Sequence, residues 1–126
     1  VGGPLNDVNT LDVRERPARW STVAFRPHEL TLPQRGSHSA TAVGAEGRRR
    51  IVVYGGFNGE QLGDLWVLEA CPGQPAWHRP RTSGARPGDG RSGHSATAAG
   101  SHIIFLFGER QYNATFYHDI YVLNAD

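Results

Sequence analysis

The chain has 126 residues, a formal net charge of +1 at pH 7, 38% hydrophobic residues and 10% aromatic residues. This length supports one modest hydrophobic core, and the composition is typical of a folded chain rather than a disordered one. All thirteen basic residues are arginine, and their charge is nearly balanced by twelve acidic residues. Such a balance provides no strong field for nucleic acid or a membrane surface, so we expect neither as a partner.

Cys71 is the single cysteine, so the chain cannot form an internal disulfide. A reducing compartment is the simpler expectation, and we predict a cytoplasmic protein, with the nucleus as an alternative. The sequence has no leading apolar segment of the kind that directs secretion and no run of eighteen apolar residues. We therefore expect no membrane anchor.

Residues 1–34 are expected to form the end of a first repeat. Val1-Gly2-Gly3 resembles the end of an apolar strand, and residues 7–12 form a short apolar run between acidic ends. Trp20 marks a further strand. Short runs of this kind, separated by polar loops, are typical of β-strands.

Residues 35–82 contain a complete set of four blocks. The first is Arg35-Gly36-Ser37-His38-Ser39-Ala40-Thr41-Ala42, and the second is Ile51-Val52-Val53-Tyr54-Gly55-Gly56. The third is Asp64-Leu65-Trp66-Val67-Leu68-Glu69, and Trp77 marks the fourth, 57 positions after the Trp of the first repeat. These blocks predict four short strands.

Residues 91–126 repeat the first three blocks. Residues 91–98 carry the letters of 35–42 with Gly and Ser exchanged, at a distance of 56 positions, and 103–108 and 119–124 follow as apolar strands. Glu109 stands where the second Gly of the strand-ending pair is expected, which predicts a differently shaped loop. Gly and Pro interrupt the connections and no stretch of ten residues has helical periodicity, so the fold class predicted is all-β with essentially no helix.

The Arg-x-x-His-Ser start, the apolar strand ending in Gly-Gly, the Asp-Leu-Trp-Val-Leu strand and the spaced Trp resemble kelch repeats, whose period is about 50 residues. The resemblance covers nearly the whole chain. It implies a partial kelch-type β-propeller made of four-stranded antiparallel blades, with the His-Ser-Ala-Thr strand innermost and the Trp strand outermost.

A propeller closes with typically about 4 to 8 blades, so two and a half blades leave apolar faces uncovered. We expect the remaining blades of a longer chain to cover them. Assembly of several copies into a ring is the alternative.

The resemblance also implies a protein-interaction scaffold that binds a partner protein or peptide, of acidic or mixed character, through loops on one propeller rim. Arg35 and Arg91 lie in the loop before each innermost strand, where guanidinium groups can bind carboxylates in a bidentate manner. An ion pair or stacked arginine that stabilises adjacent loops is the equal alternative. Arg91→Ala is predicted to weaken partner binding; if it unfolds the protein instead, the residue is structural.

Four further positions complete the predicted partner-binding set. Phe57 and Asn58 follow the Gly pair and are expected at the same rim, where exposed aromatic side chains can anchor a partner. Arg110 and Tyr112 lie in an aromatic-rich loop between the last two strand blocks. That loop can equally pack on the next blade.

His38 and His94 recur at one position in successive repeats, which favours a structural hydrogen-bonding role over a metal-binding or nucleophilic one. Trp20, Trp66 and Trp77 are predicted to be core residues that pack between blades.

An enzyme is the second hypothesis, because some kelch propellers resemble a copper radical oxidase and others use iron as specifier proteins. Cys71 lies beside Pro72 without the tyrosine and histidine ligands of the oxidase, and the spacing that begins with Glu60 and Asp64 reaches Leu68 where the iron group has His. We assign no catalytic residue, metal ligand or cofactor in this chain. A catalytic alternative would require site residues outside it, and metal analysis of the full-length protein would separate the two hypotheses.

Overall fold

The computed structural model describes residues 2–70 and 73–126, except for the side chain of Tyr112. Within these ranges the chain forms eleven strands and one 3-10 helix of three residues. The elements are β1 (Asn9–Asp12), β2 (Arg19–Thr22), β3 (Ser39–Val43), β4 (Arg50–Phe57), β5 (Gln61–Glu69), β6 (Ala76–His78), β7 (Ser95–Ala99), β8 (His102–Leu106), β9 (Glu109–Arg110), η1 (Gln111–Asn113), β10 (Thr115–Phe116) and β11 (Ile120–Asn124). The all-β prediction is confirmed.

The second repeat forms a four-stranded antiparallel meander in the order β3-β4-β5-β6, which we call the second blade. Its strands lie within the predicted range 35–82. β4 is rich in β-branched residues and lies between β3 and β5, and most of its side chains are buried. A strand with neighbours on both edges satisfies all its backbone groups in the ladder, which explains why the most apolar block takes this position.

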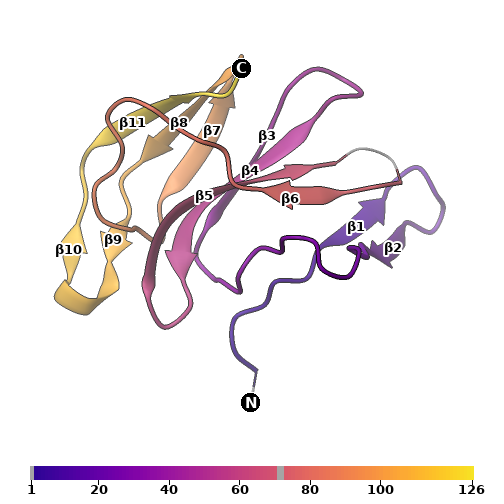
Figure 1. Ribbon diagram of the computed structural model, residues 1–126, viewed down its shortest axis with the longest axis horizontal. Helices are drawn as coiled ribbons and strands as arrows, with labels where there is room; N and C mark the ends of the chain where they lie inside the picture. Colours follow the sequence, from indigo (N-terminus) through magenta and orange to yellow (C-terminus); the bar gives the residue numbers. More distant parts are fainter. Residues whose placement is uncertain (1, 71–72) are drawn as a thin grey trace.

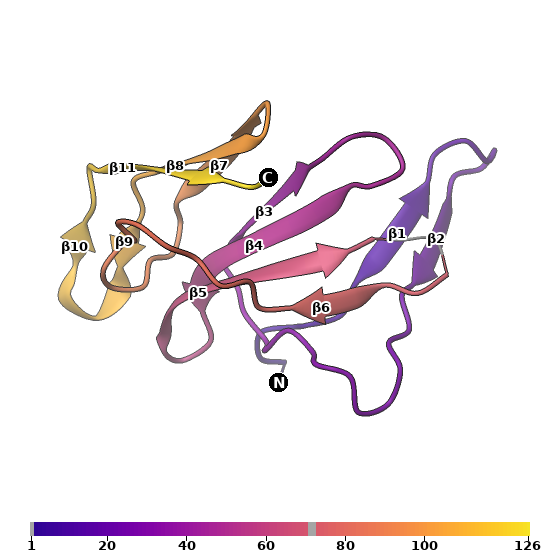
Figure 2. The same ribbon diagram turned by 45° about the horizontal axis from the view of Figure 1, so that its top comes forward.

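The third repeat forms a three-stranded sheet in the order β7-β8-β11, which we call the third blade. Between β8 and β11 the chain makes a separate hairpin of β9 and β10, closed by η1. The third blade lies beside the second, with β3 next to β7. Figures 1 and 2 show the second and third blades next to each other at an angle, with β1 and β2 on the side of the second blade that faces away from the third.

Strand register shows which residues of the two blades correspond. Ser39 pairs with Tyr54 in the second blade, and Ser95 pairs with Leu106 in the third. Leu106 therefore occupies in the third blade the position that Tyr54 has in the second. These two residues are 52 positions apart in the sequence, whereas Ser39 and Ser95 are 56 positions apart. The turn between the first two strands is shorter in the third blade, which accounts for the difference.

The prediction for Glu109 is therefore wrong, since it does not occupy the place of the second Gly. Glu109 forms an isolated bridge with Ser92, as Phe57 does with Gly36 in the second blade. Glu109 corresponds to Phe57, and Gly108, with a φ of 97°, is the second Gly of the pair.

The first Gly of the pair is replaced by an aromatic residue. Phe107 corresponds to Gly55, and the two have φ values of 60° and 66°. A Cβ at Gly55 would lie 2.5 Å from the backbone oxygen of Arg91, so the second blade needs glycine where the third blade approaches it. Phe107 holds the same left-handed conformation with a side chain that is 51% exposed.

The hydrophobic core has two parts. One lies between the second and third blades and comprises Val43, Val52, Tyr54, Val67, Ile103 and Phe105. The other lies on the opposite face of the second blade and comprises Leu32, Val53, Trp66, Leu68 and Trp77, with Val8 and Phe25 of the first repeat packed against it. Each face of the second blade is thus covered by a neighbouring repeat, and full burial of such side chains stabilises a fold by about 1.5–3 kcal/mol each.

The tryptophans divide into two groups. Trp66 and Trp77 are buried, as predicted, with their ring centroids 6.5 Å apart. The core prediction for Trp20 is wrong, because Trp20 is 69% exposed on β2, opposite Leu11 of β1. β1 and β2 form a two-stranded sheet of their own, so their register does not carry this side chain onto the second blade.

Candidate interaction surface

The recurring arginines of the two blades form equivalent bidentate ion pairs. Arg35 donates hydrogen bonds of 2.8 and 3.0 Å to the two carboxylate oxygens of Asp64. Arg91 does the same with Asp119, at 2.6 and 3.1 Å. In each blade the pair connects the loop before the first strand to the start of the third block. Two parallel charge-assisted bonds fix both position and orientation, so each pair anchors its loop to the blade.

Burial commits both guanidinium groups to these contacts. Arg35 and Arg91 are 3% and 1% exposed, and Arg91 also stacks over the ring of Tyr117, 4.3 Å from its centroid. The hydrogen bonds from Arg91 lower the pKa of Asp119. Burial acts to raise the pKa of Asp64, but the hydrogen bonds from Arg35 and Trp66 outweigh it and the pKa is lowered. These are the contacts of the structural interpretation, and they leave neither arginine side chain exposed to a partner.

Phe57 is the last residue of β4, and Asn58 begins the turn between β4 and β5. The Asn58 side chain accepts a hydrogen bond from the backbone N–H of Glu60 at 3.2 Å, and the N–H of Asn58 donates to the Glu60 carbonyl. Gly59 has a φ of 106°, which a turn this tight requires. Asn58 is exposed and Phe57 half-buried. The turn is therefore closed by its own polar groups and presents its tip to solvent.

Arg110 lies in the β9–β10 hairpin and forms an ion pair of 2.8 Å with Asp89. Both side chains are substantially exposed. The backbone N–H of Gln111 donates to the side-chain oxygen of Gln61 at 2.9 Å, which links this hairpin to the β4–β5 turn of the neighbouring blade. The predicted contact of Tyr112 depends on a side chain outside the described residues.

Two hairpins from neighbouring blades thus lie side by side at one edge of the molecule, as Figures 1 and 2 both show. We call residues 57–61 and 109–116 together the hairpin rim. Among the described residues of the rim, Phe116 has the most exposed large hydrophobic side chain, at 73%. The charged residues on the rim are Glu60, Glu109 and Arg110, so its charge is mixed.

His94 takes the structural role predicted for it. Its Nε2 lies 2.7 Å from the hydroxyl oxygen of Ser39, a hydrogen bond that joins the third blade to the second, and its ring packs edge-on to Tyr54. Burial, assisted by the positive charges of Arg91 and His38, lowers the pKa of His94 to about 4. The imidazole is therefore neutral near pH 7.

Sequence reasoning missed the partners of the recurring arginines. Asp64 and Asp119 begin equivalent blocks and lie 55 positions apart. An acid and a base that recur together in successive repeats are a signal for a conserved contact within each blade, and this signal could have identified both ion pairs. The contact between Gln61 and Gln111 has no such signal, because neither residue recurs.

The described residues contain no group of three or more His, Cys, Asp or Glu side chains placed to hold a metal ion. Cys71, relevant to the oxidase comparison, lies outside them. Over the same ranges, no helix has the length and apolar character needed to cross a bilayer.

Comparison with known proteins agrees with this architecture. The chain matches the KLHDC2/KLHL20/DRC7 Kelch-repeats domain over residues 2–126. It is 38% identical to human Host cell factor 1 over 106 residues, which is 82% of this chain and 5% of that protein. It is 35% identical to Host cell factor of Drosophila melanogaster over 109 residues, covering 82% of this chain and 7% of the relative.

A further relative is an F-box/kelch-repeat protein of Arabidopsis thaliana, 33% identical over 96 residues that cover 73% of this chain and 19% of the relative. The chain thus spans less than a fifth of the length of these three relatives. The domain match extends over nearly the whole chain, and the four-stranded meander of the second blade has the strand order that kelch repeats imply. This chain belongs to the kelch-repeat family.

Proposed function

We propose that the hairpin rim of this chain is the surface through which it binds a partner protein. Kelch repeats generally serve as protein-interaction scaffolds. The observation that carries the proposal is the junction between Gln61 and Gln111, which joins loops of two blades into one surface. A surface built from several loops on a rigid β-scaffold offers a partner a defined shape without ordering long flexible segments.

The predicted site residues take different roles in this proposal. Phe57, Asn58 and Arg110 belong to the rim and contact the partner, with Phe116 as an additional aromatic anchor. Arg35 and Arg91 position the loops from inside. Because the charges of the rim are mixed, we propose a partner segment of mixed charge at this surface. The single cysteine remains the basis for placing this interaction in a reducing compartment, the cytosol or nucleus.

The experiment compares two exposed aromatic residues. Phe116→Ser removes the anchor from the rim, whereas Trp20→Ser removes an equally exposed aromatic side chain from β2, away from the rim (Figure 1). Proteins captured by the parent chain are identified by mass spectrometry, and a purified one is then titrated by calorimetry. We expect Phe116→Ser to weaken its binding at least tenfold and Trp20→Ser to leave it unchanged. Equal affinity for both variants would overturn the proposal.

A further inference from the structure

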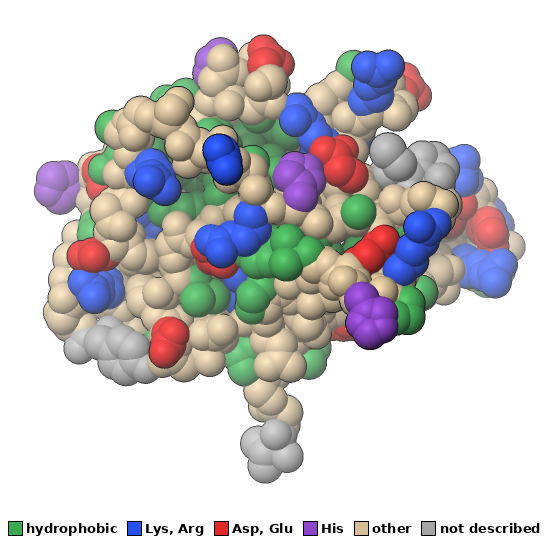
Figure 3. Space-filling model, viewed as in Figure 1, with side chains coloured by type: hydrophobic (Ala, Val, Ile, Leu, Met, Phe, Trp, Pro, Cys, Tyr) green, Lys and Arg blue, Asp and Glu red, His purple; other side chains and the backbone are tan. Residues whose placement is uncertain are grey.

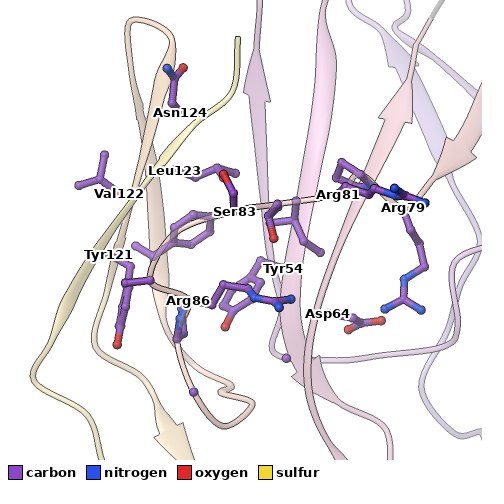
Figure 4. Close-up of a pocket in the computed structure, with 18 residues that line it drawn as sticks. Tyr54, Asp64, Arg79, Arg81, Ser83, Arg86, Tyr121, Val122, Leu123 and Asn124 are labelled. Atoms are coloured by element: carbon purple, nitrogen blue, oxygen red, sulfur yellow. The ribbon is translucent and has the colours of Figure 1, made fainter.

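The linker between the second and third blades borders an open pocket distinct from the hairpin rim. Residues 79–88 cross the junction of the two blades and leave a cavity of about 750 Å³ beneath them. This volume lies within the range of about 300–1,000 Å³ that is usual for ligand sites. Figure 4 shows side chains of β11 on one side of the cavity and Arg79 and Arg81 on the other, with Tyr54 and Arg86 between them.

The floor of the pocket is apolar and its upper wall is basic. Phe105, Tyr121 and Leu123 contribute apolar surface from the third blade. The linker contributes three guanidinium groups, those of Arg79, Arg81 and Arg86. Figure 3 shows basic side chains set among exposed hydrophobic atoms on the face viewed in Figure 1, which the linker crosses.

The basic charge of the pocket is not neutralised from within. Arg81 and Arg86 are exposed and form no hydrogen bond or ion pair with any described residue, while Arg79 stacks over the ring of Trp66 at 5.4 Å. Asp64 is the acidic residue of the lining, and its carboxylate is already bound by Arg35 and Trp66. An anionic ligand would therefore meet two guanidinium groups that have no competing partner in the described chain.

A buried donor in the same pocket points independently to a ligand. Tyr54 lines the cavity and is 5% exposed, and its hydroxyl donates no hydrogen bond to a described residue, although the Arg91 guanidinium acts on its oxygen. Buried hydroxyl groups are rarely left without a partner, because burial deprives them of water. An acceptor oxygen from a ligand would satisfy this group and would carry the charge that the linker arginines favour.

We propose that the linker pocket binds an anionic side chain of a partner peptide, with an apolar neighbour of that side chain packed on the floor. Arg81 and Arg86 bind the anion, a carboxylate or a phosphate, and Tyr54 donates a hydrogen bond to it. The inference rests on the proposed role in protein interaction but uses a different surface. It also explains how the chain could favour acidic partners although Arg35 and Arg91 are buried.

The test measures fluorescence anisotropy of a labelled peptide of alternating Glu and Leu, added to the full chain at low salt. Alternating phosphoserine and Leu distinguishes phosphate from carboxylate as the anion, and alternating Gln and Leu is the neutral counterpart. We expect one or both anionic peptides to bind and the neutral peptide to bind at least tenfold more weakly, a difference of about 1.4 kcal/mol. Absence of binding by both anionic peptides, or equal binding of the neutral one, would overturn the proposal.

Matched charge variants separate the pocket from general attraction. Arg81→Gln combined with Arg86→Gln should weaken anionic-peptide binding at least tenfold. Arg48→Gln combined with Arg49→Gln removes the same charge from an exposed turn elsewhere and should leave binding unchanged. Equal weakening by both pairs means non-specific attraction and refutes the site, as does displacement of the peptide by equimolar inorganic phosphate.

Tyr54→Phe removes only the hydroxyl. We expect it to weaken anionic-peptide binding about threefold or more. The chain should stay folded, because Arg91 keeps its bidentate ion pair with Asp119 when the hydroxyl is removed. Unchanged affinity would remove Tyr54 from the site. Phe116→Ser should leave peptide binding in this assay unaffected, so failure of the rim proposal and failure of the pocket proposal give different results.

Discussion

Gly55 lies where the loop of Arg91 in the third repeat approaches the second blade, and Gly55→Ala tests how tightly the third blade packs on the second. The added Cβ would lie 2.5 Å from the backbone oxygen of Arg91 and 3.0 Å from Cε1 of His94. The first of these atoms belongs to the backbone and cannot move without displacing the loop. The same oxygen accepts a 2.9 Å hydrogen bond from the N–H of Gly56, which the displacement would weaken.

The magnitude follows from two contributions. Alanine in the left-handed region costs about 1–2 kcal/mol, and Gly55 has a φ of 66°. Loss of the hydrogen bond to Arg91 adds about 1 kcal/mol, and displacement of the loop adds packing losses of similar size. We therefore expect Gly55→Ala to lower the free energy of unfolding by about 3–4 kcal/mol.

Gly93→Ala is the matched control, because Gly93 has a φ of 65° but a Cβ there would have nothing within 4 Å. Gly93→Ala should lower the free energy of unfolding by the backbone contribution alone, about 1–2 kcal/mol. Urea unfolding followed by tryptophan fluorescence measures both variants, since Trp66 and Trp77 are buried. Equal destabilisation by the two substitutions would show that backbone strain alone matters and that the blades are not in tight contact at Gly55.

Two further predictions concern the interior of the third blade. Asp119→Ala should lower the free energy of unfolding by about 3–5 kcal/mol, because it leaves the Arg91 guanidinium buried without its carboxylate partner. Arg91→Ala should lower it less, by about 2–3 kcal/mol, because the remaining carboxylate is 36% exposed and can be hydrated. A double-mutant cycle in urea measures the coupling, and unchanged stability of Arg91→Ala would contradict a structural role. The pKa of His94 is about 4 in the folded chain, against 6.5 for an ordinary histidine. Between these two pH values the unfolded chain therefore binds more protons than the folded chain, and the free energy of unfolding decreases as the pH falls from about 6.5 to 4. His94→Phe should reduce this loss when urea midpoints are compared at pH 7 and 5, and an unchanged loss would assign it to other groups.

Repetition made the architecture predictable. Blocks that recur in the same order indicate residues in equivalent positions of successive repeats, and they predict the strand order seen in the second blade. The burial of Trp66 and Trp77 was predictable because both lie in the complete repeat, which has a further repeat on each side in the sequence. Trp20 could not be assigned in the same way, because exposure depends on which face a neighbouring repeat covers, and that is a property of the assembled sheet rather than of the strand.

The candidate site was predictable in place but not in detail. Phe57 and Asn58 follow the Gly pair, so their position at the end of β4 and at the start of the next turn follows from the sequence. The burial of Arg91 depends instead on an aspartate 28 residues away. The position of Glu109 was misassigned because a shorter turn earlier in the blade shifts the numbering, and only the ladder of hydrogen bonds settles the register. The linker pocket depends on how residues 79–88 cross the two blades, which no local pattern encodes.

Phe107 has a consequence for the order of the repeats. Where the second blade carries a hydrogen atom at Gly55, the third carries a phenyl ring on a backbone with nearly the same φ. A neighbour docked on the third blade with the geometry by which Arg91 meets Gly55 would collide with that ring. The two blades are therefore not interchangeable: exchanging their sequences would put the ring inside the junction that now closes over glycine, so each repeat is specific to its own position in the series.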